Sequence, residues 1–139
     1  MMKAVVGIVA GLAVWIAIVI VAGMIVRVSW PAYASVAAAM TFTLPMLVAR
    51  LSIGALATLA AGLVTTVIVP RSMLVRLMPG VILLVAFIPQ HIILWNTFPV
   101  WYHLAFLLTL VPLTYAGGQI TLPLHRTSFS GDQPPPSAL

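Results

Sequence analysis

Three residues within apolar stretches of this sequence have side chains that could bind a ligand or move a proton: Arg50, His91 and His103. His91 lies one helical turn before Trp95, and His103 lies two residues after Trp101, so antiparallel helices would hold both rings at similar depth. Two such rings could ligate haem or a metal ion, or hydrogen-bond a quinone carbonyl. The alternative is a pair of amphipathic rings at a membrane interface, where the nitrogens reach water or carbonyls. Without a third ligand or a motif spacing, we predict no metal site and no cofactor, and keep His91 and His103 as candidates.

Arg50 is the second candidate site, one helical turn before Gly54 on the same helix face. A charge in the bilayer core costs about 2.5–3.5 kcal/mol on insertion scales unless its side chain snorkels to the interface. Side chains lean toward the N-terminus of their helix, so Arg50 can snorkel. Because a cation near a helix N-terminus is mildly unfavourable, a phosphate or carboxyl group could also neutralise it. The sequence therefore predicts snorkelling, contact with a ligand or lipid headgroup, or a hydrogen bond inside the protein.

Residue types that the apolar stretches lack exclude several functions. Asp132 is the only acidic residue, so no apolar stretch holds a carboxylate that could couple proton or cation movement to transport. Catalysis by histidine would lack a carboxylate to orient the imidazole, and we predict that the protein is not an enzyme. The sequence has no cysteine, which removes disulfides and Cys-ligated metals. Its six Lys and Arg residues are scattered singly, so we predict no binding of nucleic acid.

The elements that position these residues must be transmembrane helices. The chain has 139 residues, of which 63% are hydrophobic and 5% are charged. Soluble domains carry roughly 25% charged residues, because a surface that faces water needs them. So few charges cannot cover such a surface, and the surrounding medium must be the lipid bilayer. We therefore predict an all-α, polytopic membrane helical bundle.

Four apolar runs are long enough to cross the ~30 Å hydrocarbon core, at about residues 4–26, 45–69, 77–95 and 100–118. The first run exceeds the roughly 7–15 residues of a signal-peptide core, so we expect a span there rather than a cleaved signal. Proline is tolerated in a first helical turn, which places Pro45 and Pro79 near the starts of the second and third spans. Pro89 should kink the third span, and Gly117-Gly118 should end the fourth.

Two segments lie outside these spans. Residues 30–40 could lie along the interface, re-enter the membrane or extend the second helix. Residues 119–139 contain a run of three prolines among polar residues, and we predict a disordered cytoplasmic tail.

The distribution of cations predicts the orientation, because cytoplasmic loops carry an excess of Lys and Arg. One side of the four-span layout holds Lys3, Arg71, Arg76 and Arg126. The other side holds only Arg27 and Arg50, which favours an N-in/C-in topology. That second side also gathers the aromatic residues of an interfacial belt, namely Trp30, Tyr33, Trp95, Phe98, Trp101 and Tyr102.

Small residues recur at four-residue spacing in two spans, as Gly7 and Gly11 in the first and Gly54, Thr58 and Gly62 in the second. Small side chains at this spacing let helix backbones approach closely, which matters where no hydrophobic effect operates between helices. They could serve dimerisation, or packing within one four-helix bundle. We favour packing within the bundle, because four helices already need close internal contacts.

An aromatic-proline segment precedes the last span and reads Leu94-Trp95-Asn96-Thr97-Phe98-Pro99-Val100-Trp101-Tyr102; that span ends Pro112-Leu113-Thr114-Tyr115-Ala116-Gly117-Gly118. In this layout the chain resembles small four-span bacterial inner-membrane proteins of unknown function. The resemblance implies a multi-pass protein of the bacterial cytoplasmic membrane and supplies no catalytic residues. The chain departs from small multidrug exporters, since it lacks their membrane glutamate.

Three functions remain. The leading hypothesis is a non-enzymatic helical bundle that serves as an accessory or assembly subunit or as a homo-oligomer, with the bilayer and another membrane protein or a second copy as its partners. The first alternative is a small permease or channel for a neutral or anionic solute, with Arg50 and the histidines in an outer vestibule. The second is a haem- or quinone-associated redox subunit built on His91 and His103.

Overall fold

The computed structural model describes residues 1–120 and contains five helices within that range: α1 (Met2–Ser29), α2 (Pro31–Val36), α3 (Leu44–Ile68), α4 (Met73–Ile93) and α5 (Val100–Ile120). All except α2 are long and apolar enough to cross a membrane. The prediction of an all-α bundle with four spans is confirmed, and the chain is a multi-pass integral membrane protein. The predicted disordered tail lies outside the described residues, apart from Gln119 and Ile120, which belong to α5.

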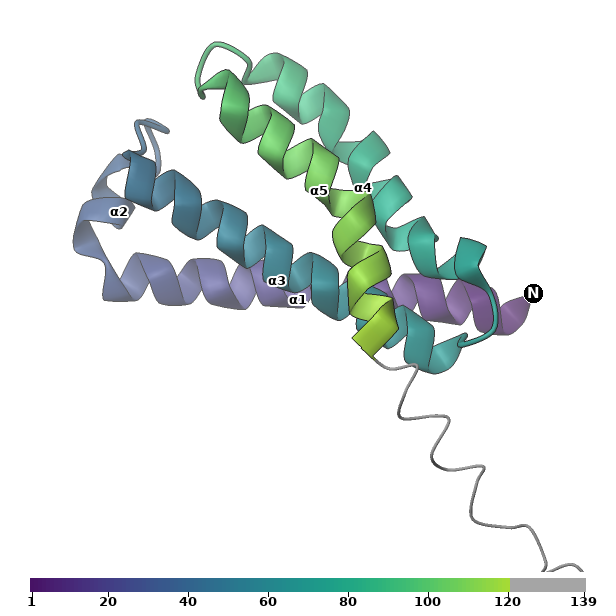
Figure 1. Cartoon of the computed structure of the whole chain (residues 1–139). Coiled ribbons are helices and arrows are strands. Elements are labelled where there is room, and N and C mark those ends of the chain that lie inside the picture. The colour runs from purple at the N-terminus through teal and green to yellow at the C-terminus, as the bar shows by residue number, and fades with distance from the viewer. Residues whose placement is uncertain (121–139) are drawn as a thin grey trace, which may run out of the picture.

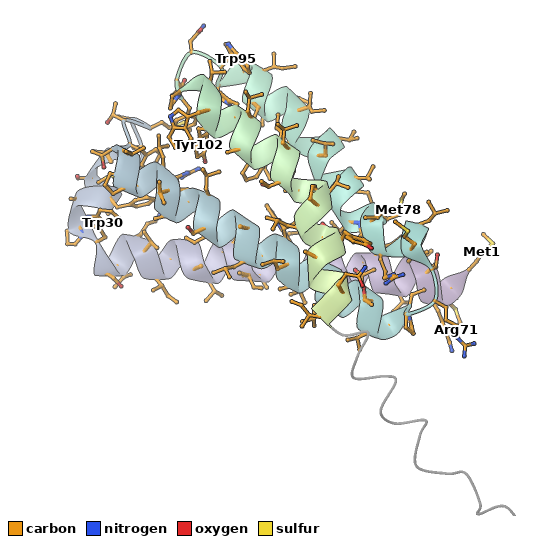
Figure 2. The ribbon with its side chains drawn as sticks, in the orientation of Figure 1. Met1, Trp30, Arg71, Met78, Trp95 and Tyr102 are labelled. Carbon is orange, nitrogen blue, oxygen red and sulfur yellow. The ribbon has the colours of Figure 1, made fainter. Side chains whose placement is uncertain are left out.

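The helices form two antiparallel pairs that touch at one end of the bundle and diverge toward the other (Figure 1). Helix α3 packs against both α1 and α5, while α4 packs mainly on α5. We call the end where the pairs touch the base; it holds the N-terminus, the α3–α4 link and the end of α5. The opposite end, with α2 and the α4–α5 link, is the aromatic end. Figure 2 shows Trp30, Trp95 and Tyr102 there, far from Met1 and Arg71 at the base.

Two predicted helix boundaries are wrong. Helix α4 begins at Met73, because Ser72 Oγ accepts a hydrogen bond from the Val75 N–H at 3.4 Å and caps the helix. Pro79 therefore lies inside α4 rather than in its first turn. Helix α5 continues through Gly117 and Gly118 to Ile120. No glycine within residues 1–120 has a positive φ, so these two glycines do not end a helix.

Residues 30–43 form a structure of their own rather than an extension of α3. Helix α2 begins at Pro31, which suits the first helical turn. Met40 has a φ of 56°, the left-handed conformation that turns the chain before α3. Pro45 lies at the start of α3, as the sequence predicts. The turn directs Tyr33 of α2 back toward α3, where it is buried.

The base is closed by glycines that let backbones touch. A Cβ on Gly62 of α3 would overlap the backbone carbonyl of Thr114 on α5, and one on Gly117 would overlap the carbonyl of Leu59. A Cβ on Gly11 of α1 would meet Thr65 Oγ1 and the Ala61 carbonyl.

Buried hydroxyl groups reinforce these contacts. Thr65 Oγ1 donates to the carbonyl oxygen of Gly7 at 3.1 Å, and Trp15 Nε1 donates to Thr58 Oγ1 at 3.1 Å. Gly54 faces Phe106 of α5. The small residues that the sequence singled out thus pack helices of one chain against each other.

Candidate functional site

A crevice of about 250 Å³ lies in the half of the bundle toward the aromatic end, where the helix pairs diverge. All five helices within residues 1–120 contribute to its lining, which consists of Trp15, Val19, Gly23, Arg27, Tyr33, Arg50, Ile53, Gly54, Phe87, Tyr102 and Phe106. Arginine and tyrosine side chains form one part of this lining and apolar side chains the rest. The crevice therefore has a polar part and an apolar part, which are described in turn.

Arg50 is the centre of the polar part. It lies in the second turn of α3 and is half-buried. Its Nη1 donates to the hydroxyl of Tyr33 at 3.0 Å, and its Nε donates to the hydroxyl of Tyr102 at 3.3 Å. The guanidinium also lies over the ring of Phe42, with its carbon 4.7 Å from the ring centroid, a cation–π contact. Arg50 thus joins the α2 segment, α3 and α5 at the aromatic end.

The cluster of Tyr33, Arg50 and Tyr102 has more hydrogen-bond donors than its two side-chain acceptors, the phenol oxygens, take up. A guanidinium carries five N–H donors, and the two phenols occupy two of them. Each phenol accepts from Arg50, so its own O–H proton stays available. Within residues 1–120 neither Tyr33 nor Tyr102 donates a hydrogen bond to another group. These three side chains therefore present donors to whatever enters the crevice.

The charge around the crevice is positive and unbalanced. Arg27, an exposed residue in the last turn of α1, also lines it. Residues 1–120 contain no Asp or Glu, since Asp132 is the only acidic residue of the chain. Arg27 is favoured by the C-terminal dipole of α1, whereas Arg50 stands near the N-terminus of α3, where the dipole opposes a cation. An anion beside Arg50 would remove that unfavourable interaction.

The apolar part of the crevice is a wall of aromatic rings nearer the middle of the bundle. The rings of Trp15 and Phe87 have centroids 5.4 Å apart, and those of Phe87 and Phe106 meet edge to face at 5.2 Å. Because its indole donates to Thr58, Trp15 is held in place. This wall offers no polar group to a ligand and suits hydrocarbon.

His91 and His103 come together beside the crevice. Their Nδ1 atoms lie 2.7 Å apart, so one ring donates and the other accepts. His103 is fully buried, and the indole of Trp95 stacks on it at 4.9 Å. Both imidazoles contact the ring of Tyr102, at centroid distances of 6.3 and 6.1 Å. The pair is therefore connected to Arg50 through Tyr102.

The contact between the two imidazoles limits what the pair can bind. The rings touch directly, with centroids 5.0 Å apart, which leaves no room for a porphyrin between them. Within residues 1–120, no three His, Cys, Asp or Glu side chains are grouped so that they could hold a metal ion. His103 Nε2 is buried without a hydrogen-bond partner, and no space for a ligand is seen beside it in the part of the chain that the structure describes. A quinone or haem role for these residues stays a prediction.

Sequence reasoning missed the partners of Arg50. It assigned Tyr33 and Tyr102 to an interfacial aromatic belt, and it gave Phe42 no role. The turn at Met40 brings Tyr33 to Arg50, and no spacing in the sequence signals such a return. For Tyr102 the sequence offers one weak indication of a role in the site, because it directly precedes His103, one of the candidate residues.

Comparisons of the chain with models of protein families, with characterised proteins and with solved structures find no match. The resemblance to small four-span bacterial proteins therefore stays a prediction, and the function must be argued from the site itself.

Proposed function

We propose that this protein is a non-enzymatic membrane protein that binds an anionic group in the crevice beside Arg50. The observation that carries the proposal is the cluster of Tyr33, Arg50 and Tyr102, whose remaining hydrogen-bond donors have no acceptor among residues 1–120. A carboxylate or phosphate supplies the missing acceptors and the missing negative charge together.

The chemistry of the cluster suits an oxyanion. A guanidinium presents its donors in a planar fork that matches carboxylate and phosphate oxygens. Hydrogen bonds between charged partners are roughly twice as strong as neutral ones. Half-burial of Arg50 raises their value, since water competes less in a site of low dielectric constant. The two phenol hydroxyls would complete the binding of an anion that the guanidinium already attracts.

The closed base bears on the earlier hypotheses. The small-residue seams, which motivated a homo-oligomer, are used inside one chain. A permease needs a continuous path, whereas the crevice lies toward the aromatic end and glycine contacts close the base. Binding from one side is therefore better supported than passage. An accessory or assembly role remains a hypothesis, in which the bound anion would be shared with a partner protein.

The proposal extends to where the crevice opens. We expect the N-in/C-in topology in a bacterial cytoplasmic membrane, as the cation count and the resemblance predict. The aromatic end would then face away from the cytoplasm, and the crevice would take its ligand from the outer half of the membrane.

Native mass spectrometry of protein extracted from its own membranes tests the proposal. The wild-type chain should retain an anionic ligand, and Arg50→Met should lose it, because methionine keeps an unbranched apolar side chain without the charge. Tyr102→Phe keeps the ring but removes one O–H, and should weaken binding about tenfold, the value of one hydrogen bond to a charged group.

The matched control is Arg76→Met, which removes a cation at the opposite end of the bundle. It should retain the ligand. Circular dichroism of each variant shows whether the helices are intact. Equal ligand retention by the wild type and by a folded Arg50→Met variant would refute the proposal.

A further inference from the structure

We infer that the anion in the crevice is the headgroup of a membrane phospholipid with net negative charge, and that one acyl chain of this lipid lies along the aromatic wall. The inference rests on the proposed anion site and names its ligand class. A small anion dissolved in water would use only the part of the crevice around Arg50.

The crevice is polar around Arg50 and apolar along the aromatic wall, as a phospholipid is polar at its headgroup and apolar along its acyl chains. Arg27 and Trp15 both line it, and they are twelve residues apart on α1. At 1.5 Å per residue this separation is about 18 Å along the helix axis. One leaflet accounts for about 15 Å, half of the ~30 Å hydrocarbon core. The crevice thus runs from the headgroup level to about the depth that a single acyl chain reaches.

The crevice opens on the outside of the bundle. Val19 and Gly23 of α1 and Ile53 of α3 line it, yet all three are only half-buried. A Cβ built on Gly23 would meet no atom within 4 Å. In a membrane the medium at this opening is lipid, so a phospholipid can enter sideways without crossing water.

The size of the crevice allows only one acyl chain of the lipid to enter. Its volume of about 250 Å³ lies just below the roughly 300–1,000 Å³ of pockets that enclose drug-sized ligands. A headgroup phosphate and part of one chain fit, while the second chain stays in the bilayer. The bound chain gains little over its place among other lipid tails, because no hydrophobic effect operates between apolar groups in hydrocarbon. Selectivity must therefore come from the headgroup, and from its charge.

Trp15 provides a reporter inside the crevice. The test uses the full chain with Trp15 as its single tryptophan, in which Trp30, Trp95 and Trp101 are replaced by phenylalanine. The protein is placed in phosphatidylcholine nanodiscs that contain a fixed fraction of lipid brominated on its chains. The brominated lipid is either phosphatidylglycerol or phosphatidylcholine, and bromine quenches an indole that it touches.

Brominated phosphatidylglycerol should quench Trp15 more strongly than the same fraction of brominated phosphatidylcholine. Arg50→Met should remove most of this preference, a reduction of about tenfold or more, because it removes the positive charge together with every donor of the guanidinium. Arg76→Met, the control at the base, should keep the preference. An excess of inorganic phosphate should leave the quenching unchanged. Should the single-tryptophan variant not fold, native mass spectrometry of wild type and Arg50→Met compares retention of the same two lipids.

The possible outcomes separate the two proposals. If inorganic phosphate binds to the wild type through Arg50, while the two lipids quench Trp15 equally, the lipid inference is overturned and the anion site stands. If neither phosphate nor phosphatidylglycerol is preferred over phosphatidylcholine, and Arg50→Met changes nothing, both proposals fail. A preference for phosphatidylglycerol that depends on Arg50 and resists phosphate supports both.

Discussion

The contact between Gly62 of α3 and Thr114 of α5 allows a sharp test of how the base is held together. A Cβ on Gly62 would overlap the Thr114 backbone carbonyl, which cannot turn aside as a flexible side chain could. Gly62→Ala should therefore force α3 and α5 apart. Gly23→Ala makes the same chemical change in the interior of α1, where a Cβ would meet nothing within 4 Å. The two substitutions form a matched pair.

The expected magnitude follows from the two positions. Overpacking a tight contact costs about 1–3 kcal/mol. In water, replacing glycine by alanine inside a helix stabilises the helix by about 0.5–1 kcal/mol, because alanine has the higher helix propensity. In a membrane this gain is smaller, because the separated helices keep their backbone hydrogen bonds. We therefore expect Gly62→Ala to lower the free energy of unfolding by roughly 1–3 kcal/mol, and Gly23→Ala to leave it nearly unchanged.

Reversible unfolding in lipid bicelles, followed by tryptophan fluorescence, measures both variants against the wild type. The fluorescence of Trp15 reports on the contact between α3 and α5, since Trp15 is buried in a cluster beside it that contains Ala57, Ala61, Leu83 and Leu110. Equal stability of Gly62→Ala and Gly23→Ala would show that the helices at the base are not in backbone contact. Glycine contacts would then not be what closes the base.

Two further predictions concern the histidine pair and the topology. The first measures the free energy of unfolding of His91→Ala, His103→Ala and the double variant. The two changes should couple by about 0.5–3 kcal/mol, because either change alone leaves a buried ring nitrogen without its partner. Additive effects would contradict the 2.7 Å contact between the rings. The second uses single cysteines to report the orientation, since the sequence has no cysteine of its own. Asn96→Cys should react with an impermeant maleimide on intact cells, and Ser72→Cys should react only after permeabilisation. The reverse pattern would establish an N-out topology.

Composition and run length were sufficient to predict the spans, because lipid leaves few alternatives to helices for an apolar chain. The two wrong helix boundaries lie at residues whose type is compatible both with a helix end and with a helix interior. Gly117-Gly118 is a plausible helix end in water, yet here both glycines remain helical and pack against α3. Pro79 suits a first turn, but the Ser72 cap starts α4 six residues earlier, at Met73. The state of the two glycines cannot be decided without knowing which helix lies opposite, whereas Ser72 is a local capping signal that the prediction of the third span did not use.

The candidate site was predictable only in its charged residue. An arginine inside an apolar run demands an explanation, and Arg50 was therefore found from the sequence. Its hydrogen-bond partners come from two other elements, since Tyr33 is seventeen positions before it and Tyr102 fifty-two after it. Tyrosines beside a membrane-spanning run usually indicate an interface, so their second role as hydrogen-bond partners of Arg50 required the three-dimensional structure.

The distribution of small and aromatic residues explains why a crevice exists at all. At the base, Gly62 and Gly117 allow the backbones of α3 and α5, one helix from each pair, to touch. Toward the aromatic end, the helices are separated by rings such as Trp15 and Phe87, which need more room than a glycine contact. Helices joined tightly at one end and spaced by rings at the other must diverge, as the two pairs do (Figure 1). The same glycines that stabilise the bundle thus hold the crevice open, and a substitution that loosens the base should also weaken the proposed anion site, although it lies far from Arg50.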